Sequence, residues 1–350
     1  MFSLRSFGLL PAVLLAVLTL PAAAASTVTR INFSSLDATQ PRNVYGTLYL
    51  RENTSVPCPA VVGVSGTSGI GSVNALHRQP LLDAGFAVFE VDFKTGIYNS
   101  PMDRSQQAVF LPLAVAALKE LRKLPAIDPN RIGMLGFSMG GGVAVRTAVE
   151  DYRTQWMRSE KGFAAHAAFY PVCEPFIPTA EHIGGLTGAP MIIFYGTADA
   201  YGEGKAVPEL EALFKKRFNF DLITVEYPGA THGFNRNEPP LTYRDPAANG
   251  RKGYMEWNPD AADDSVAKVI AFCVKTWLPS IGCHRRNPRN HRAPKKKFFS
   301  NTGTLASEGA NRIAQASGPQ WQQDANLLPR AVFFSSGSGW SNDDTRCADR

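Results

Sequence analysis

One stretch decides the fold of this chain: Arg131-Ile-Gly-Met-Leu-Gly-Phe-Ser-Met-Gly-Gly-Gly-Val-Ala-Val145. Its first half, up to Phe137, is apolar and predicts a strand, and its second half, from Gly140, is rich in small residues and predicts a helix. Between them lies a G-x-S-x-G sequence, which occurs once in the chain and has Ser138 at its centre. Because the turn from strand to helix is tight, the residues that flank Ser138 must be small. The stretch therefore predicts a strand, a sharp turn with a serine at its tip, and a helix.

Strand-like and helix-like segments alternate on both sides of this stretch. Strands are expected at residues 44–50, 60–64, 87–93, 131–137, 163–170, 191–195 and 222–227, and helices at 106–124, 140–149, 208–218 and 260–277. Alternation at this spacing predicts one α/β domain over residues 26–283, with a mostly parallel central sheet and helices on both faces. In such a sheet the functional residues lie at the carboxyl ends of the strands.

A serine hydroxyl is a weak nucleophile unless a base accepts its proton. Of the six histidines, His232 is the best placed, because Tyr227-Pro-Gly-Ala-Thr-His232-Gly-Phe follows an expected strand and precedes a long loop. The other five lie in an early helix, an expected strand, a loop or the C-terminal region. His232 is therefore the expected general base for Ser138.

The base needs an acid that orients it, and this acid is expected after the strand that lies between Ser138 and His232. Asp199 fits, since it ends Met191-Ile-Ile-Phe-Tyr-Gly-Thr-Ala-Asp199. Glu203 lies farther along the same loop and Asp221 begins the next strand, so both fit less well. Asp199 is the expected acid, although an Asp after Gly196 is also typical of a simple turn.

An oxyanion formed during attack needs two hydrogen-bond donors. The backbone N–H of Met139, next to the nucleophile, is the first expected donor, and the loop after the strand at residues 60–64 supplies the second. Within Ser65-Gly-Thr-Ser-Gly69 we favour the N–H of Thr67, with Gly66 and Ser68 as neighbouring alternatives. The glycines of this loop do not form a nucleotide-binding sequence, since neither G-x-x-x-x-G-K-[ST] nor G-x-G-x-x-G before a helix is present.

Residues 1–25 have the composition of an export signal. Arg5 supplies a positive start, residues 7–20 are largely apolar, and Ala22–Ala25 provides the small residues that signal peptidases recognise. Cleavage is expected near Ala25–Ser26, and the alternative is a membrane anchor helix. No later run reaches the roughly 18 apolar residues that a membrane span needs. The mature protein is therefore expected to be exported, periplasmic or extracellular, without a membrane span.

The excess positive charge lies at the other end of the chain. The 36 Lys and Arg residues divide into 25 in residues 1–283 and 11 in residues 284–350, and the 30 Asp and Glu residues divide into 25 and 5. The net charge of +6 therefore belongs to the last 67 residues. Their composition predicts a disordered basic tail, with electrostatic adhesion to anionic surfaces or nucleic acid as the alternative. The near-neutral domain is not expected to bind nucleic acid.

The cysteines at positions 58, 173, 273, 283 and 347 leave two interpretations open. Export implies an oxidising compartment, in which the first four could form up to two disulfides in three possible pairings. Cys273 also falls on the apolar face of the last expected helix, where it could simply be a buried thiol. No cysteine or histidine cluster has zinc spacing, and neither a metal nor another cofactor is expected.

Three segments together resemble the dienelactone hydrolase family of α/β-hydrolases: Gly136-Phe-Ser-Met-Gly-Gly141, Tyr195-Gly-Thr-Ala-Asp199 and Tyr227-Pro-Gly-Ala-Thr-His-Gly-Phe234. The resemblance covers roughly residues 30–280. It implies an α/β-hydrolase fold and hydrolysis of esters or lactones without a metal. The namesake enzymes use a cysteine nucleophile, whereas Ser138 is similar to the esterase relatives.

These observations predict an exported serine hydrolase that acts on a small-molecule ester or lactone through Ser138, Asp199 and His232. A peptidase or acyltransferase with the same three residues is the first alternative. A binding protein that has kept the fold without the chemistry is the second.

Overall fold

The computed structural model describes residues 26–37, 42–52, 57–93 and 107–277. The expected export signal and basic tail, Cys283, Cys347 and the loop at residues 94–106 lie outside the described residues. The described strands and helices begin with β1 at Ser26 and end with α8 at Trp277.

An eight-stranded sheet forms the centre of the fold, in the order β1-β2-β4-β3-β5-β6-β7-β8. The two strands at one edge, β1 and β2, pair antiparallel with their neighbours, and all pairs from β4 to β8 are parallel. The strands are β1 Ser26–Ser34, β2 Asn43–Arg51, β3 Cys58–Val64, β4 Ala87–Asp92, β5 Ile127–Phe137, β6 His166–Phe169, β7 Met191–Gly196 and β8 Ile223–Tyr227. The prediction of a mostly parallel sheet is confirmed.

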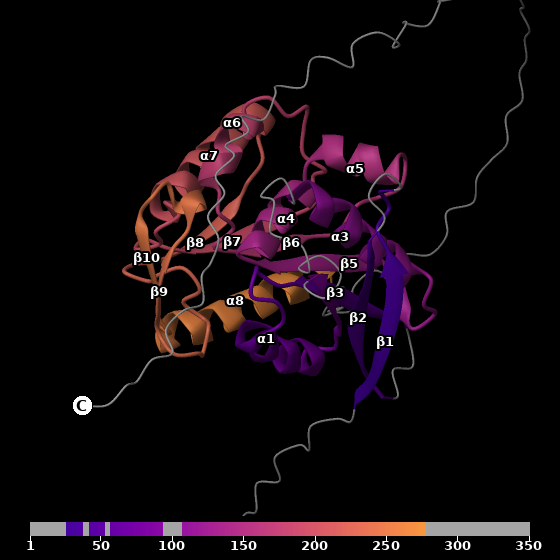
Figure 1. Ribbon diagram of the computed structural model, residues 1–350. Helices are drawn as coiled ribbons and strands as arrows, with labels where there is room; N and C mark the ends of the chain where they lie inside the picture. Colours follow the sequence, from indigo (N-terminus) through magenta and orange to yellow (C-terminus); the bar gives the residue numbers. More distant parts are fainter. Residues whose placement is uncertain (1–25, 38–41, 53–56, 94–106, 278–350) are drawn as a thin grey trace, which may run out of the picture. The chain divides into compact units, whose positions relative to one another are not determined.

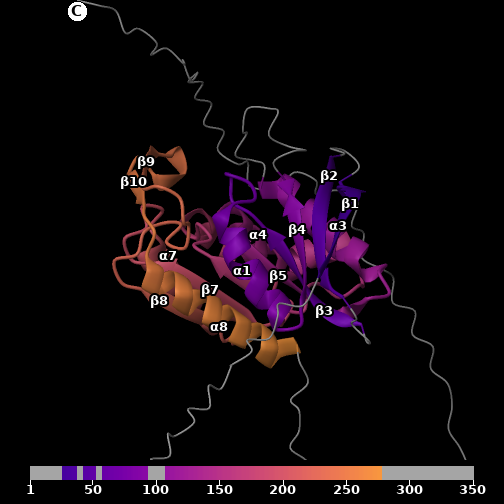
Figure 2. The same ribbon diagram turned by 90° about the horizontal axis from the view of Figure 1, so that it is seen from below.

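Helices cover both faces of this sheet, as Figure 1 shows in a view along its edge. One face carries α1 and α8, which lie side by side (Figure 2). The other face carries α3, α4, α5 and α7. The helices are α1 Ser72–Asp83, α3 Gln107–Arg122, α4 Met139–Thr147, α5 Glu150–Met157, α6 Ile177–Ala180, α7 Glu203–Phe218 and α8 Pro259–Trp277. The two layers predicted from the alternating sequence pattern are therefore present.

Alternate residues of the buried strands pack into two hydrophobic cores, one on each face of the sheet. In β3, Val62 packs into the core beneath α3 and α4, and Val61 packs into the core beneath α1 and α8. In β7, Ile193 and Ile192 divide in the same way. Successive side chains of a strand point to opposite faces, so a strand buried on both sides must be apolar throughout. This requirement explains the continuous apolar runs in the sequence.

Some element boundaries differ from the sequence-based expectation. Helix α7 begins at Glu203, whereas the sequence pattern placed its start at Pro208. Strand β6 begins at His166 rather than at residue 163. A hairpin of β9 Leu241–Arg244 and β10 Lys252–Met255, joined through the 3-10 turn η3 Pro246–Ala248, was not predicted. Neither were β1 and α5, whose short or polar sequences carry a weak apolar pattern.

The described cysteines, Cys58, Cys173 and Cys273, are free and buried. No disulfide joins any two of these three, so that part of the disulfide expectation is wrong, and burial of Cys273 on α8 is confirmed. Within the described ranges, no helix is long and apolar enough to cross a membrane.

Candidate active site

The turn between β5 and α4 holds Ser138 in an unusual backbone conformation. Its φ of 53° and ψ of −116° lie in a region that residues with a side chain rarely adopt. The chain must bend so tightly here that a Cβ added to Gly136 would lie 2.0 Å from the carbonyl oxygen of Gly140. A Cβ added to Gly140 would lie 2.2 Å from the carbonyl oxygen of Val64 in β3. Both flanking glycines are therefore required by close backbone approach, as the sequence predicted.

Ser138, His232 and Asp199 form a continuous chain of hydrogen bonds. The Nε2 atom of His232 lies 2.8 Å from the Oγ of Ser138, and its Nδ1 lies 2.7 Å from the Oδ2 of Asp199. The side chains of His232 and Asp199 are 2% and 0% exposed. A carboxylate at Nδ1 favours the tautomer with a proton there, which leaves Nε2 free to accept from the serine hydroxyl. The structure thus brings together the three residues that the sequence singled out.

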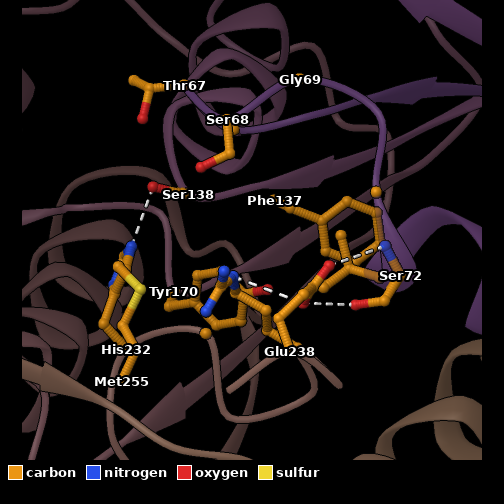
Figure 3. A pocket seen from close by; sticks show the side chains of 15 residues that line it. Thr67, Ser68, Gly69, Ser72, Phe137, Ser138, Tyr170, His232, Glu238 and Met255 are labelled. Carbon is orange, nitrogen blue, oxygen red and sulfur yellow. Dashed lines mark hydrogen bonds and ion pairs between the residues drawn. The ribbon is translucent and has the colours of Figure 1, made fainter. Parts of the chain in front are cut away.

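A small pocket of about 80 Å³ opens beside Ser138. Figure 3 shows Ser138 and His232 on one side of this pocket, with Thr67 and Ser68 above the serine and Met255 next to the imidazole. Met255 comes from β10, so the unpredicted hairpin contributes to the wall of the pocket.

The two residues expected to hold an oxyanion lie on either side of Ser138. Met139 is the first residue of α4, directly after Ser138, and its side chain is buried. Thr67 lies in the loop after β3 and lines the pocket together with Gly66 and Ser68. Gly66 lies close to the nucleophile, since a Cβ added to it would lie 3.1 Å from the Cβ of Ser138. The loop that the sequence indicated is therefore at the site, with Thr67 and both alternatives in place.

The far side of the pocket carries a carboxylate that is tied to the start of α1. The Oε1 of Glu238 accepts from the backbone N–H of Ser72 at 3.2 Å, and its Oε2 accepts from the hydroxyl of Ser72 at 2.7 Å. The Nε of Arg236 lies 3.4 Å from the same carboxylate (Figure 3). A carboxylate at a helix N-terminus is favoured by the helix dipole. Glu238 therefore fixes the loop that follows His232 against α1.

Three further residues surround the pair of His232 and Asp199: two tyrosines that sequence reasoning missed, and Glu203, which it considered only as a weaker candidate for the acid. Tyr170 and Tyr201 pack against the imidazole, with ring centroids 4.8 Å and 4.5 Å from it. Glu203 is fully buried near Asp199 and accepts from the backbone N–H of Cys173 at 2.6 Å. Burial, together with the charge of Asp199, raises the pKa of Glu203 to about 8. A tyrosine in a loop carries no sequence signal of such a role, because the partner residues come from distant segments.

Among the described residues, no group of three or more His, Cys, Asp and Glu side chains is arranged to hold a metal ion. The chemistry that these residues can carry out is proton transfer from the serine hydroxyl to the imidazole, with the carboxylate stabilising the resulting imidazolium.

A serine at a strand–helix turn, followed in the chain by an aspartate and a histidine on later strand ends of a mostly parallel sheet, is the arrangement of the α/β-hydrolases. Residues 46–273 match the dienelactone hydrolase family, and the chain belongs to this family.

Curated relatives share a part of this region. The chain is 31% identical over 106 residues to "Esterase FrsA" of Photorhabdus laumondii, a match that covers 30% of this chain and 25% of the relative. It is 30% identical over 95 residues to "Esterase FrsA" of Vibrio vulnificus, covering 27% of this chain and 22% of that protein. The chain thus matches about a quarter of the length of these curated relatives.

Solved structures show the same fold. A dienelactone hydrolase-like promiscuous phosphotriesterase, P91 from metagenomic libraries, superimposes with a TM-score of 0.53 at 20% identity. A putative dienelactone hydrolase from Klebsiella pneumoniae superimposes with a TM-score of 0.51 at 18% identity. Each match covers 71% of this chain and 99% of the other. Almost the whole length of each of these solved chains is therefore matched by this fold.

Proposed function

We propose that the protein is a serine hydrolase that cleaves carboxylic esters or lactones through an acyl-enzyme. The observation that carries the proposal is the hydrogen-bond chain from Ser138 through His232 to Asp199, which lies beside a pocket. Membership of the dienelactone hydrolase family and the partial match to two proteins named esterases support the same reaction class.

The reaction proceeds in two halves. The Oγ of Ser138 attacks the ester carbonyl carbon while its proton passes to the Nε2 of His232. The carbonyl oxygen becomes an oxyanion that accepts from the backbone N–H groups of Met139 and Thr67. Its collapse breaks the bond to the alcohol oxygen, which receives the proton from His232. A water molecule then attacks the acyl-enzyme by the same route and releases the acid.

The Asp199 carboxylate acts throughout as an orienting group. It accepts from the Nδ1–H of His232 and stabilises the imidazolium that exists while the proton is held at Nε2. Because the imidazole and the carboxylate are buried, water does not compete for this hydrogen bond.

The test is hydrolysis of p-nitrophenyl acetate and butyrate by wild type and Ser138→Ala. Loss of the nucleophile should lower kcat/KM by on the order of 10³-fold or more. Ser159→Ala, which removes an exposed hydroxyl away from the pocket, is the matched control and should keep the wild-type rate. Equal rates for wild type and Ser138→Ala would contradict the proposal. Parallel incubation with peptides, or with an acceptor alcohol, distinguishes a peptidase or an acyltransferase by its products.

We also propose that the enzyme is exported and cut near Ala25–Ser26. In support, Ser26 pairs with Arg51 of β2, so cleavage there keeps every described residue of the edge strand β1. N-terminal sequencing of the protein recovered outside the cytoplasm checks this cleavage site, and a retained leader would contradict it.

A further inference from the structure

The imidazole of His232 packs against two tyrosine rings. The ring of Tyr170 approaches it at 4.8 Å between centroids with an interplanar angle of 63°, and the ring of Tyr201 approaches it at 4.5 Å and 58°. Tyr170 follows β6 and Tyr201 follows β7, so the two rings come from separate strand ends. The imidazole is therefore confined from two directions, in addition to its hydrogen bonds.

Tyr201 differs from Tyr170 because it also binds the carboxylate. Its backbone N–H donates to the Oδ1 of Asp199 at 2.8 Å, while the Oδ2 of Asp199 holds the imidazole. A carboxylate that accepts one bond at each oxygen has a fixed plane, which is the condition for a well-directed bond to Nδ1–H. A single residue thus contacts both the acid and the base of the site.

Tyr201 is itself anchored by the hairpin that follows His232. Its hydroxyl donates to the Oδ2 of Asp245 at 2.8 Å, and its ring stacks on Tyr243 of β9 with centroids 5.7 Å apart and an interplanar angle of 22°. The ring of Tyr243 in turn lies over Gly253 of β10, where an added Cβ would be 2.0 Å from a ring atom. Tyr201 is only 7% exposed. The hairpin therefore anchors the Tyr201 ring that packs against His232.

We propose that Tyr201 is a positioning residue that fixes the Asp199–His232 pair and that the β9–β10 hairpin anchors it. This inference rests on the proposed function, since it assigns Tyr201 a part in the proton transfer from Ser138. The ring restricts the imidazole to the plane in which Nε2 faces the serine hydroxyl. Its aromatic face also stabilises the imidazolium that forms in a site from which water is excluded. A displacement of about 1 Å in such a site can cost on the order of 10²-fold in rate.

Two substitutions of Tyr201 separate the ring from the hydroxyl. Tyr201→Leu removes the aromatic ring and fills the space with apolar atoms, and kcat should fall roughly 10- to 100-fold with KM within about twofold. Tyr201→Phe keeps the ring and loses the bond to Asp245, so most of the activity should return, to within about tenfold of wild type. Tyr254→Leu, at an exposed position on the same hairpin, is the matched control and should keep the wild-type kcat.

A spectroscopic readout tests the position of the imidazole directly. With ¹⁵N-labelled histidine, the proton on Nδ1 of His232 should give a resolved NMR signal in wild type, because it is bonded to Asp199 and shielded from water. In Tyr201→Leu this signal should broaden through exchange with solvent, and in Tyr201→Phe it should persist. A purely structural role for Tyr201 would lower the melting temperature and leave both the signal and kcat unchanged in the folded protein.

The outcomes distinguish the two proposals. If wild type hydrolyses esters, Ser138→Ala does not, and folded Tyr201→Leu keeps both kcat and the Nδ1–H signal, the positioning role is overturned and the proposed function stands. If no ester is cleaved but the signal is lost in Tyr201→Leu, the geometric part of the inference stands and the proposed function fails. Should Tyr201→Leu not fold, Gly253→Ala displaces the Tyr243 ring that stacks on Tyr201, because the added Cβ would lie 2.0 Å from that ring, and an unchanged kcat and signal in that variant would overturn the inference.

Discussion

The backbone of Ser138 has a strained conformation that the surrounding structure stabilises. A positive φ in a residue other than glycine costs on the order of 1–3 kcal/mol. In return, the turn places the Oγ of Ser138 within 2.8 Å of the imidazole and puts the nucleophile at the head of α4. The backbone N–H groups at a helix N-terminus favour negative charge, so this strained position is also the one best suited to an oxyanion.

The strain leads to a prediction about two variants that both lack the nucleophile. Ser138→Gly should be more stable than Ser138→Ala by about 1 kcal/mol, because glycine adopts the backbone angles of this turn at no steric cost. The gain exceeds the extra entropy that glycine has in the unfolded chain, which is about 0.5–1 kcal/mol. Thermal unfolding should show Ser138→Gly melting roughly 2–4 °C higher. A melting temperature equal to or below that of Ser138→Ala would mean that the turn is not strained.

The site could be predicted from sequence as far as local pattern reaches. Ser138, Asp199 and His232 each follow an apolar strand, and parallel strands end at one edge of a sheet, so their proximity could be inferred. The residues that surround His232 could not be predicted in this way. Tyr201 owes its place to a stacking partner and a carboxylate from a hairpin about 40 residues away in the chain, which no periodicity indicates.

At the scale of elements, the start of α7 decides the environment of the acid. The helix begins at Glu203, a turn and a half before the expected start at Pro208, and this puts the Glu203 carboxyl into the interior next to Asp199. The carboxyl accepts from the backbone N–H of Cys173, which fixes the loop after β6. The sequence pattern placed the start later, at Pro208, a residue type that is common in the first turn of a helix. The tertiary hydrogen bond of Glu203 is the reason that the first turn forms earlier.

Glu203 should make stability depend on pH. Its pKa is about 8 in the folded protein, raised above the ordinary value of 4.5 chiefly by burial. Between these values the folded state binds more protons than the unfolded state, so the free energy of unfolding falls as pH rises through this window. Glu203→Gln cannot ionise and keeps an acceptor for Cys173. Its stability advantage over wild type should grow by on the order of 1 kcal/mol per pH unit from pH 5 to 8 and then level off.

Urea unfolding of wild type and Glu203→Gln between pH 5 and 9 measures this difference. Glu209→Gln is the matched control, since Glu209 lies on the same helix with its side chain in solvent in both states, and it should follow the wild-type curve. Parallel curves for wild type and Glu203→Gln would show that the buried carboxyl does not govern the pH dependence.

For the whole molecule, the sequence predicted the layers but not the order of the strands. The alternation of strand and helix required a sheet covered on both faces, and the structure has one. The antiparallel edge formed by β1 and β2 was not expected, because β1 is exposed along most of its length and so lacks a continuous apolar pattern. The hairpin of β9 and β10 was not predicted for the same reason. Edge strands need fewer apolar residues than buried ones, and apolar periodicity is the main signal available from sequence.

Each hydrophobic core encloses one histidine that must stay neutral. His77 of α1 packs between Phe137 and Phe169, in the core beneath α1 and α8. His166 of β6 is fully buried and packs against Phe163, which belongs to the opposite core. Burial lowers the pKa of His77 to about 4 and that of His166 to about 3. Both histidines, one in each core, therefore stay neutral in the folded protein until the pH falls well below the ordinary pKa of histidine.

These two histidines should accordingly make acid destabilising. Above pH 6.5 both histidines are neutral in either state; as pH falls toward 4, the unfolded chain takes up protons at both sites and the folded protein does not. Each histidine removes on the order of 1 kcal/mol per pH unit between pH 6.5 and pH 4.5, whereas Glu203 acts in the opposite direction over the same window, so the net loss should be smaller than the sum of the two histidine contributions. His77→Leu keeps an apolar contact with the two phenylalanines. Its unfolded state takes up one proton fewer in acid than that of wild type, so its free energy of unfolding should fall less steeply as pH is lowered. Urea unfolding of both proteins at pH 8 and pH 5 measures this difference. The stability of the variant relative to wild type should rise toward pH 5. An equal change in stability in both proteins would show that His77 is not the acid-sensitive group.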